Sequence, residues 1–94
     1  IAFAFASQTV SNTALKLEAF TDFTLAQVER ANRIILTVET QSLRYCYDGT
    51  APTSALGHLL TAGSRLELVG DENIRKLQVI RVTTDSTVMV TLEE

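Results

Sequence analysis

Apolar and polar residues alternate in several short stretches of the chain, most clearly over residues 34–40. Ile34, Leu36 and Val38 would share one face of an extended strand there, and Thr37 would lie on the other face. Because successive side chains of a strand point to opposite faces, this pattern predicts a strand that buries one face in a core.

Similar patterns recur at intervals of about ten residues along the chain. In the last of them Val88, Val90 and Leu92 would face inward and Met89 outward. Apolar residues occupy both faces in the middle of 75–83, which predicts a central strand covered on both sides. Together with 34–40, the predicted strands span 14–20, 43–47, 65–69, 75–83 and 87–92.

The first ten residues are also expected to be extended. Phe3 and Phe5 alternate with alanines, so both aromatic side chains should lie on one face. Two interpretations of residues 1–10 follow from this pattern. They form the first strand of the domain's own sheet, or they reach out as an N-terminal arm that packs on a neighbouring subunit.

Residues 24–31 carry a mixed signal, which is compatible with one short helical turn. Either Thr24 or Asp22 is suited to cap a helix in which Leu25 and Val28 share one face. An irregular connection is the alternative.

The residues after the predicted strand 43–47 indicate a turn. Asp48 and Gly49 are strong turn formers, and the side chain of Asp48 is expected to accept hydrogen bonds from the backbone of its own turn. Pro52 lacks a backbone donor and should end regular pairing. Polar turns are also expected at 62–64 and 70–73.

About six to eight short antiparallel strands, spaced in this way, predict an all-β fold. We expect one domain over residues 1–94, built as a β-sandwich of jelly-roll or immunoglobulin-like type. Hydrophobic residues make up 46% of the chain and charged residues 20%, which is ordinary for a globular domain.

Charge and cysteine content narrow the classes of function. The formal net charge is −3 and the eight Lys and Arg are scattered, so nucleic acid is not an expected partner. The longest apolar run, 1–6, is far shorter than a membrane span and lacks the basic flank of a signal peptide, so no membrane association is expected. With one cysteine and one histidine, no Cys-based or His-based metal site is expected within one chain.

Three residues have the chemistry of a thiol nucleophile, a base and an orienting acid: Cys46, His58 and Asp48. No predicted helix begins near Cys46 to lower the pKa of its thiol, so a structural cysteine is the preferred interpretation. The run Asp71–Asn73 offers oxygen ligands without the spacing of a known calcium loop. We therefore expect no catalytic residues, no metal and no cofactor, and a protein that is not an enzyme.

Two tyrosines and several apolar residues have both a packing and a binding interpretation. Tyr45 and Tyr47 could stack on a sugar if exposed, although packing in the core or at a subunit interface is preferred. The apolar surface left over predicts self-association, since pairing would cover both apolar patches and strand edges. The candidate interface residues are Phe3, Phe5, Met89 and Arg81, the last as an inter-subunit ion pair.

A family resemblance covers roughly residues 34–94. It rests on Ile35–Thr40, Leu43–Tyr45, Asp48–Thr53, Gly57–Leu60, Ala62–Gly63, Asn73–Ile74 and Thr84–Thr91. This pattern resembles a family of small tailed-phage virion proteins. The resemblance implies a symmetric homo-oligomer, with a trimer favoured, that acts as a capsid cement or decoration protein.

The family also implies where such a protein works and with what. It would bind the major capsid protein or another virion protein on the outside of the capsid, bridging neighbouring capsomers after assembly in the host cytoplasm. A tail or neck accessory role is an alternative. The stretch 43–53 is also similar to immunoglobulin-like modules appended to chitin- and glycan-degrading enzymes, which implies a carbohydrate-binding or adhesion module instead.

Overall fold

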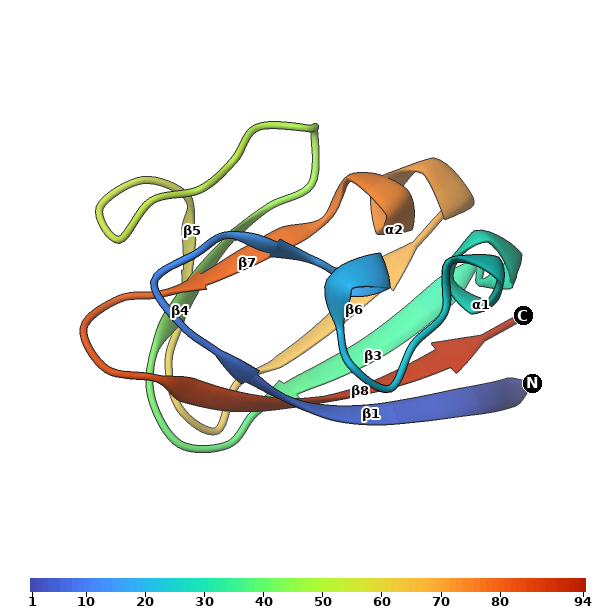
Figure 1. The fold of residues 1–94 in the computed structure, drawn as a ribbon, viewed down its shortest axis with the longest axis horizontal. Helices are drawn as coiled ribbons and strands as arrows, with labels where there is room; N and C mark the ends of the chain where they lie inside the picture. Colours follow the sequence, from blue (N-terminus) through green and yellow to red (C-terminus); the bar gives the residue numbers. More distant parts are fainter.

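Two antiparallel sheets of four strands each pack face to face in the computed structural model, which describes residues 1–94 (Figure 1). Sheet A has the strand order β1-β8-β3-β6, and sheet B has the order β2-β7-β4-β5. The strands span Ala2–Val10 (β1), Leu15–Lys16 (β2), Arg33–Val38 (β3), Leu43–Cys46 (β4), His58–Leu60 (β5), Arg65–Val69 (β6), Gln78–Arg81 (β7) and Ser86–Glu93 (β8). The predicted all-β sandwich is confirmed.

The strand pairs are nested along the chain. β1 pairs with β8, β2 with β7, β3 with β6 and β4 with β5, as in one long folded ribbon. The additional pairs β3–β8 and β4–β7 roll this ribbon into two facing sheets. Eight strands in this order form a jelly roll, whereas an immunoglobulin-like domain pairs its first strand with its second.

The inward face of each long strand supplies the core. Ile34, Leu36 and Val38 of β3 are buried, and Val88, Val90 and Leu92 of β8 pack beside them, as the alternation predicted. From sheet B, Leu43 and Val79 fill the opposite side of the same cluster. The one buried polar side chain is Ser86, whose hydroxyl donates to the carbonyl oxygen of Gln41 at 2.6 Å.

Residues 1–10 form an integral strand of sheet A. β1 pairs with β8 from Ala2 opposite Glu93 to Val10 opposite Ser86, with a bulge between Ala2 and Ala4. The bulge takes Phe3 out of the simple alternation. Phe3 and Phe5 still line one open depression with Thr91, but Phe3 is partly buried against the core whereas Phe5 is 58% exposed.

The first helix, α1 (Leu25–Arg30), lies where a helical turn was predicted. Thr24 is its cap: the Thr24 hydroxyl accepts from the Gln27 backbone N–H at 3.2 Å, and the Gln27 side chain accepts from the Thr24 N–H at 2.9 Å. This reciprocal pair satisfies two donors at the helix start. Val28 is the buried residue of the helix.

The second helix, α2 (Asp71–Lys76), was not predicted. The sequence interpretation placed a polar turn and the start of a strand here, but only Gln78–Arg81 is extended. Asp71 and Glu72 in the first turn and Arg75 and Lys76 in the last turn complement the helix dipole. The central position of β7 was predicted correctly, since it lies between β2 and β4.

The strand predicted over 14–20 is also shorter than expected. β2 has only two residues, after which Leu17–Ala19 forms a 3-10 turn. The Phe20 N–H donates to the Leu17 carbonyl at 3.0 Å, and both side chains are buried. The Phe20 ring stacks on Phe23 with 5.9 Å between ring centroids. The chain leaves the strand after Lys16, and the turn that follows buries Phe20 and Phe23 in the core.

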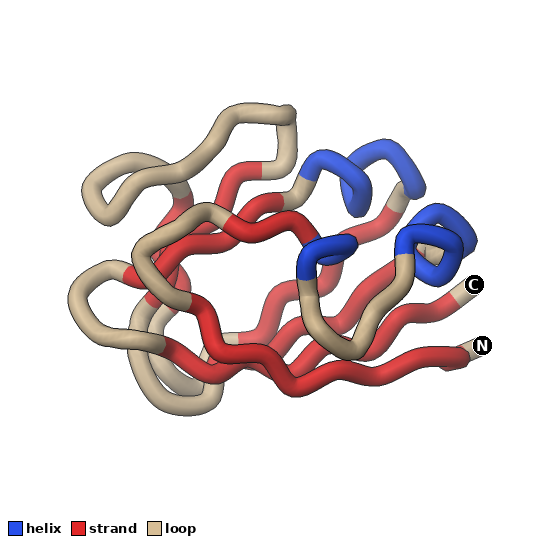
Figure 2. The backbone as a smooth tube through the Cα atoms, in the orientation of Figure 1, coloured by secondary structure: helices blue, strands red, loops and turns tan.

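The helical segments gather at one end of the sandwich, while the long loop between β4 and β5 projects from sheet B (Figure 2). α1 contacts both α2 and the 3-10 turn. No helix has the length and apolar character needed to cross a membrane.

Candidate functional site

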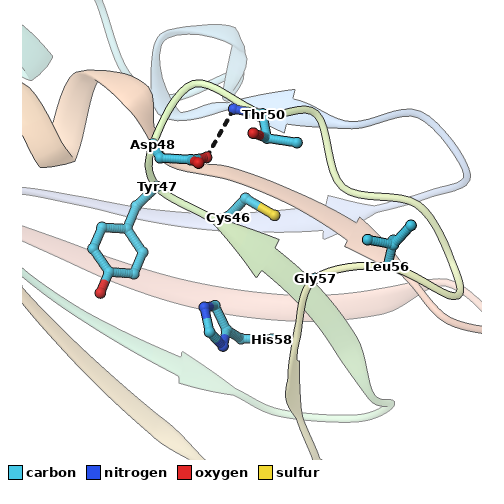
Figure 3. A pocket seen from close by; sticks show the side chains of 7 residues that line it. All are labelled: Cys46, Tyr47, Asp48, Thr50, Leu56, Gly57 and His58. Atoms are coloured by element: carbon cyan, nitrogen blue, oxygen red, sulfur yellow. Dashed lines mark hydrogen bonds between the residues drawn. The ribbon is translucent and has the colours of Figure 1, made fainter.

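An open pocket of ≈ 610 Å³ lies where β4 runs into the β4–β5 loop (Figure 3). It is lined by Cys46, Tyr47, Asp48, Thr50, Leu56, Gly57 and His58. These residues come from the end of one strand, the loop, and the first residue of the next strand. The pocket therefore depends on the conformation of the loop.

The loop begins with the predicted turn. The Thr50 backbone N–H donates to Asp48 Oδ1 at 3.0 Å, and this hydrogen bond lowers the pKa of the Asp48 carboxyl. Gly49 has φ +97°, a backbone conformation that L side chains rarely adopt. The roles predicted for both residues are confirmed.

The loop then folds back onto the outer side of sheet B. Pro52 is buried, and Thr53 and Leu56 exchange two backbone hydrogen bonds just after it. Regular pairing ends before Pro52, as predicted, and β5 begins only at His58. Gly57 packs so closely that an added Cβ would lie 3.2 Å from both the Pro52 Cβ and the Tyr45 carbonyl oxygen.

Arg44 holds the returning limb of the loop. Its Nε donates to the Ser54 carbonyl at 3.0 Å, and its Nη1 donates to the Gly57 carbonyl at 2.9 Å. The alternation of the predicted strand 43–47 gave no indication of this role for Arg44. No local pattern could have revealed it, since its partners lie ten and thirteen residues further along the chain.

Two of the residues that line the pocket, Tyr47 and His58, form a ring cluster with Tyr45, which lies outside the lining. Tyr45 and His58 lie opposite each other in the β4–β5 pair, with 5.2 Å between ring centroids. Tyr47 is 6.1 Å from Tyr45 and 6.3 Å from His58. Burial, and then the neighbouring Tyr47, raise the pKa of the Tyr45 hydroxyl. Tyr45 also packs against the core, whereas Tyr47 is 39% exposed.

Cys46, His58 and Asp48 line the same pocket but are not arranged as a catalytic triad. Cys46 is a free, partly buried cysteine, and no hydrogen bond joins its thiol to His58. Figure 3 shows the carboxylate of Asp48 turned toward the N–H of Thr50 rather than toward His58. This geometry lacks the nucleophile–base–acid relay.

The acidic run considered for calcium lies in α2 instead of a ligand loop. Asp71 pairs with Arg75 at 3.3 Å, and the Asn73 side chain donates to the Val69 carbonyl at 3.0 Å. No group of three or more His, Cys, Asp or Glu side chains is placed to hold a metal ion.

A second candidate site is an apolar area on the outer face of sheet A, which we call the outer patch: Phe5, Ile35, Met89 and Thr91. Thr91 of β8 lies opposite Phe5 of β1 on one side and Ile35 of β3 on the other. Phe5 is 58% exposed and Met89 37% exposed, so Met89 faces outward as predicted. Large exposed apolar side chains on adjacent strands are typical of an interaction surface.

The other two predicted interface residues have partners within the chain. Phe3 packs against the edge of the core, and the Arg30 guanidinium lies 4.2 Å above its ring. Arg30 is itself paired with Glu94, which raises the pKa of Arg30 and lowers that of Glu94. Arg81 pairs with Asp85 across the β7–β8 turn. An inter-subunit role for either residue stays a prediction.

Comparison with models of known protein families, with curated proteins and with solved structures finds no match to this chain.

Proposed function

We propose that this chain is a non-enzymatic structural protein of a tailed-phage virion, a capsid cement or decoration protein that self-associates and bridges neighbouring capsomers. The outer patch carries the proposal. It leaves Phe5 and Met89 exposed on two adjacent strands of sheet A. The jelly roll adds support, because virus capsid domains are among the proteins built on this architecture.

The mechanism of such a protein is complementary contact over a large area. A persistent interface buries at least about 1,000 Å² in total, and apolar side chains at its centre supply most of the free energy. Burial of one phenylalanine contributes about 1.5–3 kcal/mol. Phe5 and Met89 are suited to that central position.

Self-association is tested by measuring the molar mass of the purified chain by light scattering and sedimentation equilibrium. We expect a discrete oligomer, and a shift toward monomer for Phe5→Ser. Leu59→Ser is the matched control, since Leu59 is 51% exposed but lies in sheet B. Equal masses for Phe5→Ser and the wild-type protein would count against the outer patch.

The role in the particle needs a separate measurement. Quantitative mass spectrometry of a virion that contains the chain should give a copy number comparable to that of the major capsid protein. A few copies per particle would indicate a tail or neck accessory protein instead.

A carbohydrate-binding or adhesion module is the second candidate, and the ring cluster of Tyr45, Tyr47 and His58 favours it. Lectin domains also use the jelly roll, and sugars bind where an aromatic face lies beside polar acceptors. Asp48 lines the same pocket. Binding on a glycan array that is lost in Tyr47→Ala, with unchanged molar mass, would support this candidate over the first.

A further inference from the structure

We propose that the free edge of β1 pairs antiparallel with β1 of a second copy of this chain across a two-fold axis. Two sheets of four strands would then join into one of eight. The inference rests on the self-association in the proposed function. It specifies β1 as the contacting strand, a second copy as the partner and a two-fold axis as the symmetry.

The backbone of β1 has an unpaired side. β1 is the outermost strand of sheet A and is bonded only to β8 (Figure 1). Outside that ladder, no backbone hydrogen bond involves residues 2–10. Among these backbone groups, only the Thr9 carbonyl accepts a hydrogen bond from a side chain, that of Gln8, at 3.1 Å. Alternate residues of an edge strand direct both N–H and C=O away from their sheet, so β1 presents a row of open groups.

Each of the other three sheet edges carries charged residues or is short, and β1 has neither device. β6 carries Arg65 and Glu67, β2 has two residues including Lys16, and β5 has three residues. Charges and short length are the usual devices that keep an edge from pairing. β1 is nine residues long and contains neither a charged residue nor a proline.

The connection after β2 does contact side chains of β1, since the Gln8 side chain accepts from the Thr21 N–H at 2.9 Å and Arg30 lies above the Phe3 ring. These contacts leave the backbone groups of β1 open.

An uncharged edge presents no local charge barrier to a second copy, which is the occupant that we infer. Each copy has a formal net charge of −3, so two copies repel each other over most of their surfaces. The uncharged β1 edges add no like-charge contact to this repulsion. An antiparallel pair of identical strands also satisfies two-fold symmetry, because each residue makes the contact that its counterpart makes.

The side chains restrict the register of this pair. Phe5, Ser7 and Thr9 are exposed on the outer face, whereas Ala6 and Val10 are buried. A two-fold axis that relates antiparallel edge strands is perpendicular to the joined sheet, so outward residues lie opposite outward residues. The exposed Phe5 of each copy would then extend the partner's outer patch.

The decisive experiment compares two lysine substitutions in the same row of the outer face. Ser7 lies opposite Met89, and Met89 lies opposite Thr37 on its other side. Ser7→Lys places a charge on the β1 edge, and Thr37→Lys places one two strands away. We expect the wild-type protein to be a dimer, Ser7→Lys to raise its dissociation constant about tenfold or more, and Thr37→Lys to leave it unchanged.

The alternative outcomes separate this inference from the proposed function. Dissociation by Thr37→Lys with no effect of Ser7→Lys would overturn edge pairing and leave self-association through the sheet face. A mass of three chains would overturn the two-fold pair and leave the proposed function standing. A monomer at every concentration would overturn both the pairing and self-association.

Hydrogen exchange gives a readout that needs no variant. Amide protons on the open edge of β1 should become protected as the concentration of the wild-type protein rises. Protection in β1 that is independent of concentration would contradict the pairing.

Discussion

Arg44 and Gly57 are thirteen residues apart and are joined by a hydrogen bond of 2.9 Å from the guanidinium to the glycine carbonyl. The same guanidinium donates to the Ser54 carbonyl. One side chain on β4 thus fixes both ends of the segment that returns the chain to β5. The shape of the pocket beside it follows from this contact.

Replacing Arg44 by methionine keeps most of its apolar contacts and removes both donors. Hydrogen bonds from charged groups contribute about 1.5–3 kcal/mol each, and partial exposure reduces that figure. We expect Arg44→Met to lower the free energy of unfolding in urea by about 1–3 kcal/mol. Arg75→Met is the control: its exposed pair with Asp71 contributes at most about 1 kcal/mol, so equal losses in both variants would contradict the role of Arg44.

Gly57 and Gly63 allow backbone strain to be separated from crowding. Both have positive φ, +127° and +87°, but a Cβ at Gly63 meets no atom within 4 Å. Gly63→Ala should therefore cost only the strain of a left-handed residue, about 1–2 kcal/mol. Gly57→Ala adds a close contact with Pro52 and should lower the free energy of unfolding by about 1 kcal/mol more.

Thermal unfolding of the two variants checks this difference. If Gly57→Ala and Gly63→Ala lowered the midpoint equally, the loop would have room to move away, and the close packing of Gly57 would not contribute to stability.

The cap of α1 gives a prediction of direction and size. Thr24→Ala removes the acceptor for the Gln27 N–H and should destabilise the domain by about 0.5–2 kcal/mol. Thr24→Ser keeps the hydroxyl and should retain most of that stability. Chemical denaturation of both variants is the measurement, and an equal loss in Thr24→Ser would indicate that the threonine methyl group, not the cap, matters.

Acid should weaken the turn at Asp48. The hydrogen bond from Thr50 holds the pKa of the Asp48 carboxyl below its ordinary value. A carboxyl with a lowered pKa in the folded state contributes stability above its unfolded pKa, and that contribution disappears as the pH falls through the folded pKa. We expect the stability difference between the wild-type protein and Asp48→Ala to shrink below about pH 4.

A carbon-detected NMR titration of the carboxyl groups provides the direct measurement. The Asp48 signal should change at a lower pH than that of an aspartate without such a hydrogen bond. A midpoint at the ordinary value would show that the turn does not select the charged form.

Local alternation was enough to predict the strands that form the core. β3 and β8 were predicted correctly because each buries only one face. Apolar residues such as Ile34 and Leu36 in β3 therefore recur at every second position. Thr24 also gave a correct local signal, since a cap and its partner lie three residues apart.

The errors arose where contacts distant in sequence decide the local structure. Ile74 in α2 and Leu77 just after it have helical spacing. The apolar residues that follow nevertheless suggested one longer strand over 75–83. Contacts of α2 with β6 and α1 favour the helix. The bulge at Phe3 in the pairing with β8 was not predicted either, because nothing in residues 1–10 alone specifies that register.

The candidate pocket was only half visible in the sequence. Asp48 and Gly49 predicted the turn. Tyr47 was a candidate for stacking on a sugar, and His58 was a candidate base. Their arrangement depends on Arg44, whose bonds to the loop cannot be read from any short pattern.

The nested pairing also bears on how the chain reaches this fold. Ala2 pairs with Glu93, so the first strand has no neighbour to pair with until the chain has been synthesised as far as Glu93. Closing so long a loop is entropically costly, and domains dominated by distant contacts fold slowly. During that interval the uncharged, apolar β1 segment has no strand to pair with. Aggregation of newly made chains should therefore begin at this segment, and its rate should fall when the last strand is supplied early.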